Sequence, residues 1–97
     1  MTDYSPRYPL IVKTFQDERY RIVENMDCNI SHESDGDIII GWEAMNMYGV
    51  GATLAEALLD FESTLIEYYL ILEDDLGKSP YSYITFNYLR RFVMRND

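Results

Sequence analysis

The stretch Gly51-Ala-Thr-Leu-Ala-Glu-Ala-Leu-Leu-Asp-Phe61, which runs on to Leu76-Gly77, is the part of the sequence that decides the fold. Thr53 is a favourable N-cap, and Glu56 lies three residues later, where it can reach back to the Thr53 backbone N–H in a capping box. Gly77 suits the left-handed conformation that ends many helices. Between these limits apolar residues recur every three or four positions and predict one stripe on a long helix: Leu54, Leu58, Phe61, Leu65, Tyr68, Leu72 and Leu76.

Length and composition indicate one small domain, residues 1–97, with a frayed polar arm at 1–7. Apolar residues make up 47% of the chain, which is enough for one modest core and too much for disorder. No apolar run is long enough to span a bilayer, and the first residues lack the apolar core of a secretory signal. Cys28, the single cysteine, cannot form an internal disulfide, so we expect a cytoplasmic protein in which Cys28 is a small buried apolar group.

Two β-rich segments open the chain. Residues 8–15 and 20–23 favour strands, and the polar turn 16–19 between them predicts a hairpin. Pro9 cannot donate to a ladder, so it belongs at a strand start or at a sheet edge.

A second hairpin is predicted between residues 26–33, which alternate in polarity, and the apolar residues 38–42. Asp35-Gly36 between them is the strongest short hairpin signal and predicts a type I′ turn. Trp42 is expected to anchor the core, and residues 43–50 lead through one short strand into the long helix.

After Gly77, Ser79 as N-cap and Pro80 at the first helical position predict a C-terminal helix within residues 78–97. A short connection makes the two helices an αα-hairpin. The C-terminal helix should carry an aromatic face made by Tyr81, Ile84, Tyr88, Leu89 and Phe92. The predicted fold is α+β: a small antiparallel β-meander of three to five strands, covered by one long helix, plus this C-terminal helix.

No catalytic constellation emerges from the sequence. His32 is the only histidine, which leaves too few histidine and cysteine ligands for a zinc site, and no loop has calcium-ligand spacing. Gly49 and Gly51 precede a helix and resemble half of a phosphate loop, but Leu54 stands where a third glycine is wanted. A tight strand-to-helix turn is the preferred interpretation. We therefore expect no enzyme, no metal and no cofactor.

Charge is the strongest global feature, because 17 acidic residues outnumber 8 basic ones and give a net charge of −9. Such a surface repels phosphate backbones and attracts basic proteins, although it also serves solubility alone. Arg90, Arg91 and Arg95 gather near the C-terminus, where we expect them to complement a helix end. The predicted partner-binding residues are the outer carboxylates of the long helix, Asp60, Glu67, Asp74 and Asp75, followed by the hairpin acids Asp35 and Asp37.

The segment 36–76 resembles the HicB-like antitoxins through Gly51, Thr53, Glu56, Ala57 and Leu58. That family has a short β-meander, a turn with glycine and threonine, and a helix that opens Thr-x-x-Glu-Ala. The resemblance covers about half of the chain. It implies a cytoplasmic prokaryotic or phage protein that binds and neutralises a small basic RNA-cleaving toxin.

The chain departs from the family in three places. Residues 43–48 replace a proline-rich bend. The hairpin 8–23 either precedes the family core or supplies its first strands, in which case the later hairpin is an insertion. The family often adds a DNA-binding tail, and residues 78–97 are too short for one, so direct nucleic-acid binding is not expected. The alternative function is an acidic phage-type inhibitor that mimics nucleic-acid charge and blocks a nuclease.

Self-association is also expected. A sheet covered by one helix leaves its second face open, and Ile11, Phe15, Val23 and Ile39 alternate onto that face. Exposed apolar patches of this kind mark interfaces, and a homodimer is the commonest closed assembly.

Overall fold

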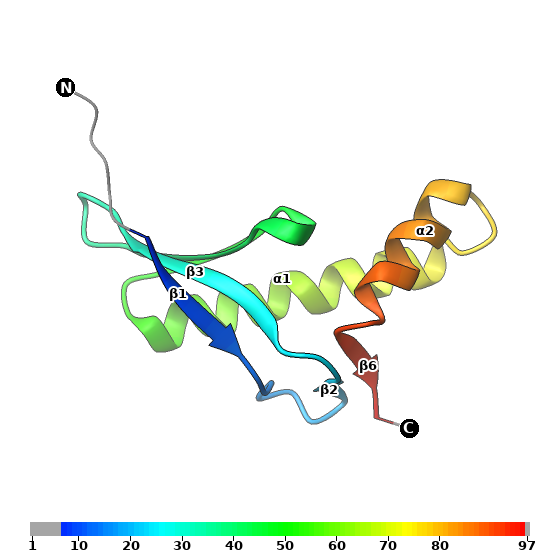
Figure 1. Ribbon diagram of the computed structural model, residues 1–97, viewed down its shortest axis with the longest axis horizontal. Coiled ribbons are helices and arrows are strands. Elements are labelled where there is room, and N and C mark those ends of the chain that lie inside the picture. The colour runs from blue at the N-terminus through cyan, green and yellow to red at the C-terminus, as the bar shows by residue number, and fades with distance from the viewer. Residues whose placement is uncertain (1–6, 97) are drawn as a thin grey trace.

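The computed structural model describes residues 7–96, so the expected polar arm lies outside the described residues except for Arg7. Four antiparallel strands form the main sheet in the order β1-β3-β4-β5, and β2 pairs with β6 in a second, two-stranded sheet. The elements in chain order are β1 (Arg7–Val12), β2 (Tyr20–Ile22), β3 (Met26–His32), β4 (Ile38–Trp42), the 3-10 helix η1 (Glu43–Met45), β5 (Met47–Gly51), α1 (Leu54–Asp74), α2 (Pro80–Leu89) and β6 (Val93–Arg95) (Figure 1).

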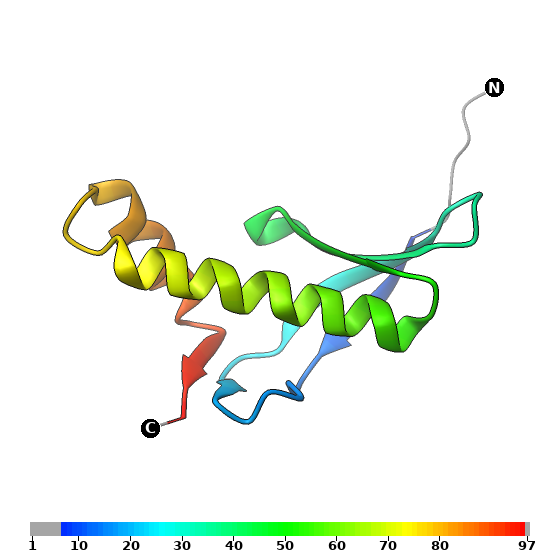
Figure 2. The same ribbon diagram turned by 180° about the vertical axis from the view of Figure 1, so that it is seen from behind.

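Helix α1 runs across one face of the main sheet, and α2 folds back beside its C-terminal end (Figures 1 and 2). The predicted α+β class, with a small antiparallel sheet, one long helix and a C-terminal helix, is confirmed. Trp42 anchors the core as expected, since it is 2% exposed and meets Phe92 edge-to-face with ring centroids 5.0 Å apart.

The predicted hairpin between the first two strands is wrong. β1 pairs with β3, with Leu10 opposite Cys28, and β2 pairs instead with β6 at the other end of the chain. The polar segment between β1 and β2 is held by α1, because Glu62 accepts the backbone N–H groups of Gln16 at 3.0 Å and Asp17 at 2.7 Å. These donors have a helix carboxylate as partner, so the segment does not need a hairpin ladder.

The β3–β4 hairpin forms as predicted, but its turn is not type I′. Gly36 has a φ of 96° and is in the left-handed region, whereas Asp35 is not. The Glu33 backbone carbonyl accepts the Gly36 N–H at 3.0 Å, and the Glu33 backbone N–H donates to the Asp37 carbonyl at 2.8 Å. These bonds make a three-residue loop with a glycine bulge. The Asp35 carboxylate also accepts the Asp37 N–H at 3.0 Å, which favours this loop.

The predicted N-cap of α1 is confirmed. Thr53 has an extended backbone, and its hydroxyl accepts the Glu56 N–H at 3.2 Å. The return bond of the capping box goes to Ala52 rather than Thr53, with Glu56 Oε2 accepting the Ala52 N–H at 3.1 Å. Gly77 has a φ of 88°, as its predicted role requires, but the helix ends at Asp74, before Leu76.

The apolar stripe of α1 is rotated relative to the prediction. Leu54 and Leu76 are exposed, at 41% and 38%. Tyr69 is buried while Tyr68 is only half-buried, because Tyr20 of β2 and Phe86 of α2 pack against the Tyr69 ring. The buried residues of α1 are Ala57, Phe61, Leu65, Ile66, Tyr69 and Leu72.

Gly49 and Gly51 allow α1 to lie directly on β5. A Cβ atom on Gly49 would collide with the Phe61 backbone nitrogen and lie 2.6 Å from the Ala57 carbonyl oxygen. A Cβ atom on Gly51 would lie 2.5 Å from the Ala57 nitrogen. The glycine pair is therefore explained by close packing of a strand on a helix, which supports the preferred interpretation of these residues as structural.

Helix α2 is capped by the Ser79 hydroxyl, which accepts the Tyr81 N–H at 3.2 Å, and begins at Pro80 as predicted. The first turns of its predicted aromatic face are exposed to solvent, with Tyr81 83% and Ile84 69% exposed, whereas Leu89 of the same face is buried. The buried residues of α2 are Phe86 and Leu89.

An aromatic cluster joins the two-stranded sheet to both helices. The Tyr69 ring of α1 meets Tyr20 of β2 and Phe86 of α2 edge-to-face, with centroids 5.4 Å and 5.0 Å apart. Such pairs add about 0.5–1.5 kcal/mol each beyond the area they bury. The cluster fixes the β2–β6 ribbon and α2 against the end of α1.

Candidate functional site

The structure gathers some of the predicted acidic residues and separates others. Asp60, Glu67 and Asp74 are spaced seven residues apart on α1 and therefore share one side of the helix. Asp75 is the C-cap residue just beyond them. Asp35 and Asp37 belong to the β3–β4 turn, which lies at the opposite end of the molecule from the end of α1 (Figure 1). The helix acids form one row, and the hairpin acids are not part of it.

Two members of the row already have partners within the chain. Asp60 Oδ2 accepts the Val50 backbone N–H at 2.9 Å, so this carboxylate holds β5 to α1. Asp74 lies 3.7 Å from the Lys78 ammonium, with both side chains largely exposed. A surface pair of this kind adds little stability, about 0–1 kcal/mol, so Asp74 stays available to a partner.

Beside this row, a groove opens between the start of β5 and the middle of α1. We name it the β5–α1 groove; its volume is about 590 Å³, and its lining residues are Met45, Asn46, Met47, Tyr48, Thr64, Glu67, Tyr68 and Ile71. Ile71 is 59% exposed and Tyr48 49% exposed, so apolar surface faces solvent here. Among the described residues, Glu67 is the only charged one in the lining.

The backbone around Asn46 shapes this groove. η1 interrupts the path from β4 to β5, and Asn46 closes it in the left-handed conformation, with a φ of 53°. Its N–H donates to the Glu43 carbonyl at 3.1 Å, and its side-chain oxygen accepts the Tyr48 hydroxyl at 3.2 Å. Asparagine tolerates this conformation better than most residues. The chain thus turns sharply and places Met45 and Met47 on one wall.

Both edges of the main sheet are blocked at one position each. Val50 points its N–H outward from β5 to Asp60. Successive residues of an antiparallel strand point their backbone N–H and C=O groups to opposite sides. Val50 lies opposite Ile39, Ile39 opposite Ser31 and Ser31 opposite Arg7, so the backbone groups of Arg7 point away from the sheet. The backbone of Pro9, two residues later on β1, faces the same way. Pro9 has no N–H, which fits its predicted place at an edge.

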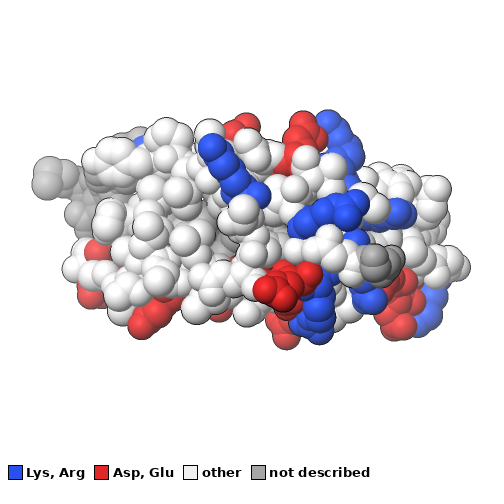
Figure 3. Space-filling model, turned by 90° about the horizontal axis from the view of Figure 1, so that it is seen from below, with Lys and Arg blue, Asp and Glu red and all other residues white. Residues whose placement is uncertain are grey.

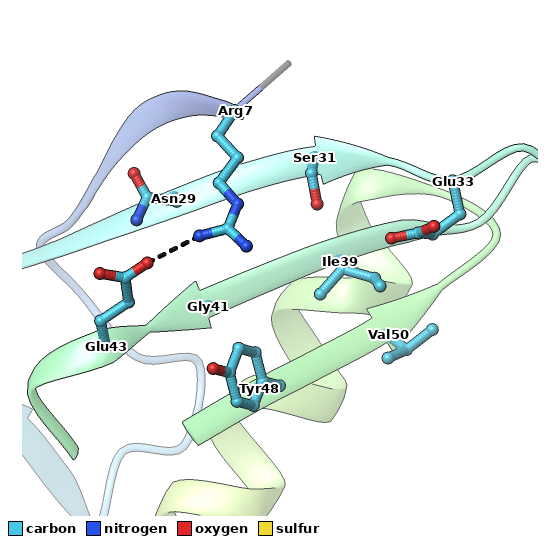
Figure 4. Close-up of a pocket in the computed structure, with 9 residues that line it drawn as sticks. All are labelled: Arg7, Asn29, Ser31, Glu33, Ile39, Gly41, Glu43, Tyr48 and Val50. Atoms are coloured by element: carbon cyan, nitrogen blue, oxygen red, sulfur yellow. Dashed lines mark hydrogen bonds and ion pairs between the residues drawn. The ribbon is translucent and has the colours of Figure 1, made fainter. Parts of the chain in front are cut away.

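The sheet face that α1 leaves uncovered carries a second hollow of about 230 Å³ (Figure 4). Arg7 reaches across it to Glu43, with 2.8 Å between Nη1 and Oε1. The Tyr48 ring lies beside Gly41, whose missing side chain deepens the hollow. The Arg7 cation and the Glu43 carboxylate at its rim neutralise each other, and Glu33 adds one further carboxylate to the lining.

The predicted dimer face is only partly correct. Ile11 and Ile39 share the uncovered sheet face with Arg7, as the register requires. Phe15 is half-buried against the core, and Val23 lies beyond the end of β2. These two residues leave the face because β2 joins β6 instead of extending the main sheet.

Basic side chains gather at the end of the molecule formed by β2, β6 and α2 (Figure 3). The predicted role of the C-terminal arginines at a helix end is wrong for Arg95, which belongs to β6 and binds Glu73 of α1 at 2.5 Å. Arg91 lies 3.9 Å from Glu24. Nearby, a hydrogen bond from Arg19 lowers the pKa of Asp17 to about 2. These arginines are thus largely matched by local carboxylates.

Cys28 is buried as predicted, at 3% exposure, and burial raises the pKa of its thiol to about 12. His32 ends β3 on the surface. Within residues 7–96, no group of three or more histidine, cysteine, aspartate or glutamate side chains is placed to hold a metal ion. The helices of this described part include none that is long and apolar enough to cross a membrane.

Comparisons of the chain with protein-family models, with curated proteins and with solved structures found no match. Candidate sites therefore stand on the chain's own geometry. Sequence reasoning found Glu67 and its neighbours in the acidic row but missed the apolar wall beside them. The signal for that wall was the left-handed tendency of Asn46, flanked by Met45 and Met47.

Proposed function

We propose that this protein is an antitoxin-like binding protein that neutralises a small basic protein, with an RNA-cleaving toxin as the partner. The observation that carries the proposal is the acidic row of Asp60, Glu67 and Asp74 on α1, which borders an exposed apolar groove. A net charge of −9 speeds encounter with a basic protein, and an apolar groove supplies a surface to bury after encounter.

The resemblance to HicB-like antitoxins supports the same function. Its matching residues form the capped start of α1, where Thr53 and Glu56 make the capping bonds and Gly51 lets the helix approach β5. This arrangement places the row of carboxylates on the outer side of a rigid helix. We propose a cytoplasmic location on the same grounds, since a family of this kind acts inside the cell and Cys28 needs no oxidising compartment.

The first experiment is a pulldown from the source cell followed by mass spectrometry. A basic ribonuclease as the main captured protein supports the toxin proposal. A defence nuclease in its place would support the alternative function, an acidic inhibitor that mimics nucleic-acid charge.

The second experiment measures association kinetics with the captured partner by stopped flow at several salt concentrations. Exposed charges are screened beyond about 8 Å at physiological ionic strength, so the association rate should fall as salt rises. The double variant Glu67→Lys/Asp74→Lys should lower that rate further. Asp60 is left unchanged because its carboxylate holds the Val50 N–H.

The matched control is Asp27→Lys/Glu33→Lys, which changes the net charge by the same amount on the sheet face that α1 does not cover. An association rate lowered equally by both double variants would mean that only total charge matters. A rate that neither salt nor the helix variant changes would refute the acidic row as the binding surface.

A further inference from the structure

We propose that the β5–α1 groove is the docking site for a basic amphipathic helix of the partner protein. The apolar side chains of that helix enter between the Met45–Met47 wall and Ile71, while its lysine or arginine side chains face Glu67 and Asp74. This inference rests on the proposed function and specifies how the partner is held.

The apolar part of the groove favours an apolar side chain of the docked helix, which we call its anchor. Met45 lies half-buried on one wall, and Tyr68 and Ile71 lie next to each other on the α1 wall, with Tyr68 half-buried and Ile71 more than half exposed. Methionine side chains are flexible and polarisable, so they adapt to anchors of different shape. A wall of this kind suits a leucine, methionine or phenylalanine side chain better than a polar one.

The charged side of the groove selects a basic flank. Glu67 is the one charged residue in the lining, and Asp60 and Asp74 continue its row one heptad away in each direction. None of the eight basic residues of the chain lines the groove. Acidic side chains on the docked segment would meet like charge at Glu67, so the fitting occupant carries lysine or arginine beside its apolar side chains.

The backbone of β5 argues for a helix rather than an added strand. A strand that docks on a sheet edge needs the outward N–H and C=O groups of that edge. Asp60 already occupies the outward N–H of Val50, which interrupts the row of donors. A helix satisfies its own backbone groups and needs only side-chain contacts, so it can use the groove without displacing Asp60.

The length of the groove fits this occupant. Its α1 wall runs from Thr64 to Ile71, about 10 Å along the helix at roughly 1.5 Å per residue. Apolar residues three or four positions apart on an incoming helix would place two anchors within that span. The hollow on the uncovered sheet face suits a basic helix less well, because the Arg7 cation stands at its rim in a pair with Glu43, although Glu33 also lines it.

Methyl NMR of protein labelled at methionine tests the proposal directly. Met45 and Met47 line the groove, whereas Met26 in the core and Met94 on β6 are internal references. The probe is a synthetic helical peptide with two leucine anchors flanked by lysines. Two matched peptides replace either the anchors by alanine or the lysines by glutamate.

The lysine–leucine peptide should shift the Met45 and Met47 methyl signals and leave Met26 and Met94 unchanged, and both matched peptides should bind at least fivefold more weakly. Ile71→Gln should weaken binding of the first peptide by a similar factor. Leu70→Gln is the matched control, because Leu70 is also exposed, at 41%, but does not line the groove.

The proposal is overturned if the alanine peptide binds as tightly as the leucine peptide, or if Ile71→Gln has no more effect than Leu70→Gln. It is also overturned if the same methyl shifts appear without peptide as protein concentration rises, because the groove would then join two copies of the chain. A partner whose association depends on salt and on Glu67 and Asp74, but not on Ile71, would refute the groove and leave the proposed function standing.

Discussion

The substitution Gly49→Ala tests how closely α1 rests on β5. The added Cβ would lie 2.6 Å from the Ala57 carbonyl oxygen and closer still to the Phe61 backbone nitrogen. Ordinary contacts between such atoms are about 3.5–4.0 Å, so α1 must move away from the strand by about 1 Å. Backbone atoms in the middle of a helix cannot turn aside as a side-chain end can. We expect the free energy of unfolding to fall by about 3 kcal/mol or more.

Gly41→Ala is the matched control on the neighbouring strand β4. Its Cβ would meet only the Tyr48 ring, at 3.0 Å and 3.1 Å, and that half-exposed ring can shift because one exposed hydrogen bond, to Asn46, holds it. The loss there should stay below about 1 kcal/mol, because alanine also lowers the entropy of the unfolded chain.

Urea denaturation followed by the fluorescence of Trp42 measures both variants, since this single tryptophan is buried in the core. A loss of about 3 kcal/mol is a large part of the ~5–15 kcal/mol typical of a small domain, so Gly49→Ala could also fail to fold. Equal midpoints for Gly49→Ala and Gly41→Ala would refute the close approach of α1 to β5.

Three further predictions concern packing, the thiol and assembly. In the same denaturation assay, Phe61→Ala should lower the free energy of unfolding by about 3–5 kcal/mol and Leu54→Ala by less than about 1 kcal/mol, because Phe61 is 1% exposed and Leu54 41% exposed. Similar losses for the two variants would contradict the rotated apolar stripe. Cys28 should resist alkylation at pH 8 until urea unfolds the chain, and rapid labelling of the folded protein would contradict its burial. Because the pKa of the buried thiol is raised, the free energy of unfolding should fall as the pH rises from 9.0 toward about 12. Sedimentation at micromolar concentration should show a homodimer through the uncovered sheet face, weakened by Ile39→Lys; a monomer at every concentration would refute it.

The parts of the fold that could be predicted are those encoded within a few neighbouring residues. Thr53 and Glu56 mark the start of α1, and Ser79 with Pro80 marks the start of α2, because each cap binds backbone groups two to four residues away. The rotation of the stripe could not be read in the same way. Tyr68 and Tyr69 are adjacent and chemically identical, and only the packing of distant residues, Tyr20 of β2 and Phe86 of α2, decides that Tyr69 is buried.

The prediction of strand pairing failed where the two strands are far apart in sequence. Tyr20 pairs with Arg95, and no local signal near either residue specifies the other. The 16–19 turn looked like a hairpin because its polar residues suit one. The alternative partner for its backbone, Glu62, lies on α1 and could not be identified from the turn itself.

The candidate site was likewise predictable only where it depends on local sequence. The acidic row was predictable, since a spacing of seven residues places Asp60, Glu67 and Asp74 on one side of any helix. That Asp60 binds the β5 edge depends on where the strand lies, and periodicity contains no such information. Charge reversal at Asp60 therefore tests the fold as well as binding.

The pairing of β2 with β6 determines the order in which the parts of this protein can fold during synthesis. The main sheet and α1 are complete in sequence once Asp74 has been synthesised, so they can fold while the rest of the chain is still being added. β2 has to wait for Val93, and until then the Tyr20 and Tyr69 rings lack the Phe86 side of their cluster. The main sheet and α1 therefore have all their residues before the β2–β6 ribbon does, and Val93–Arg95 complete the ribbon.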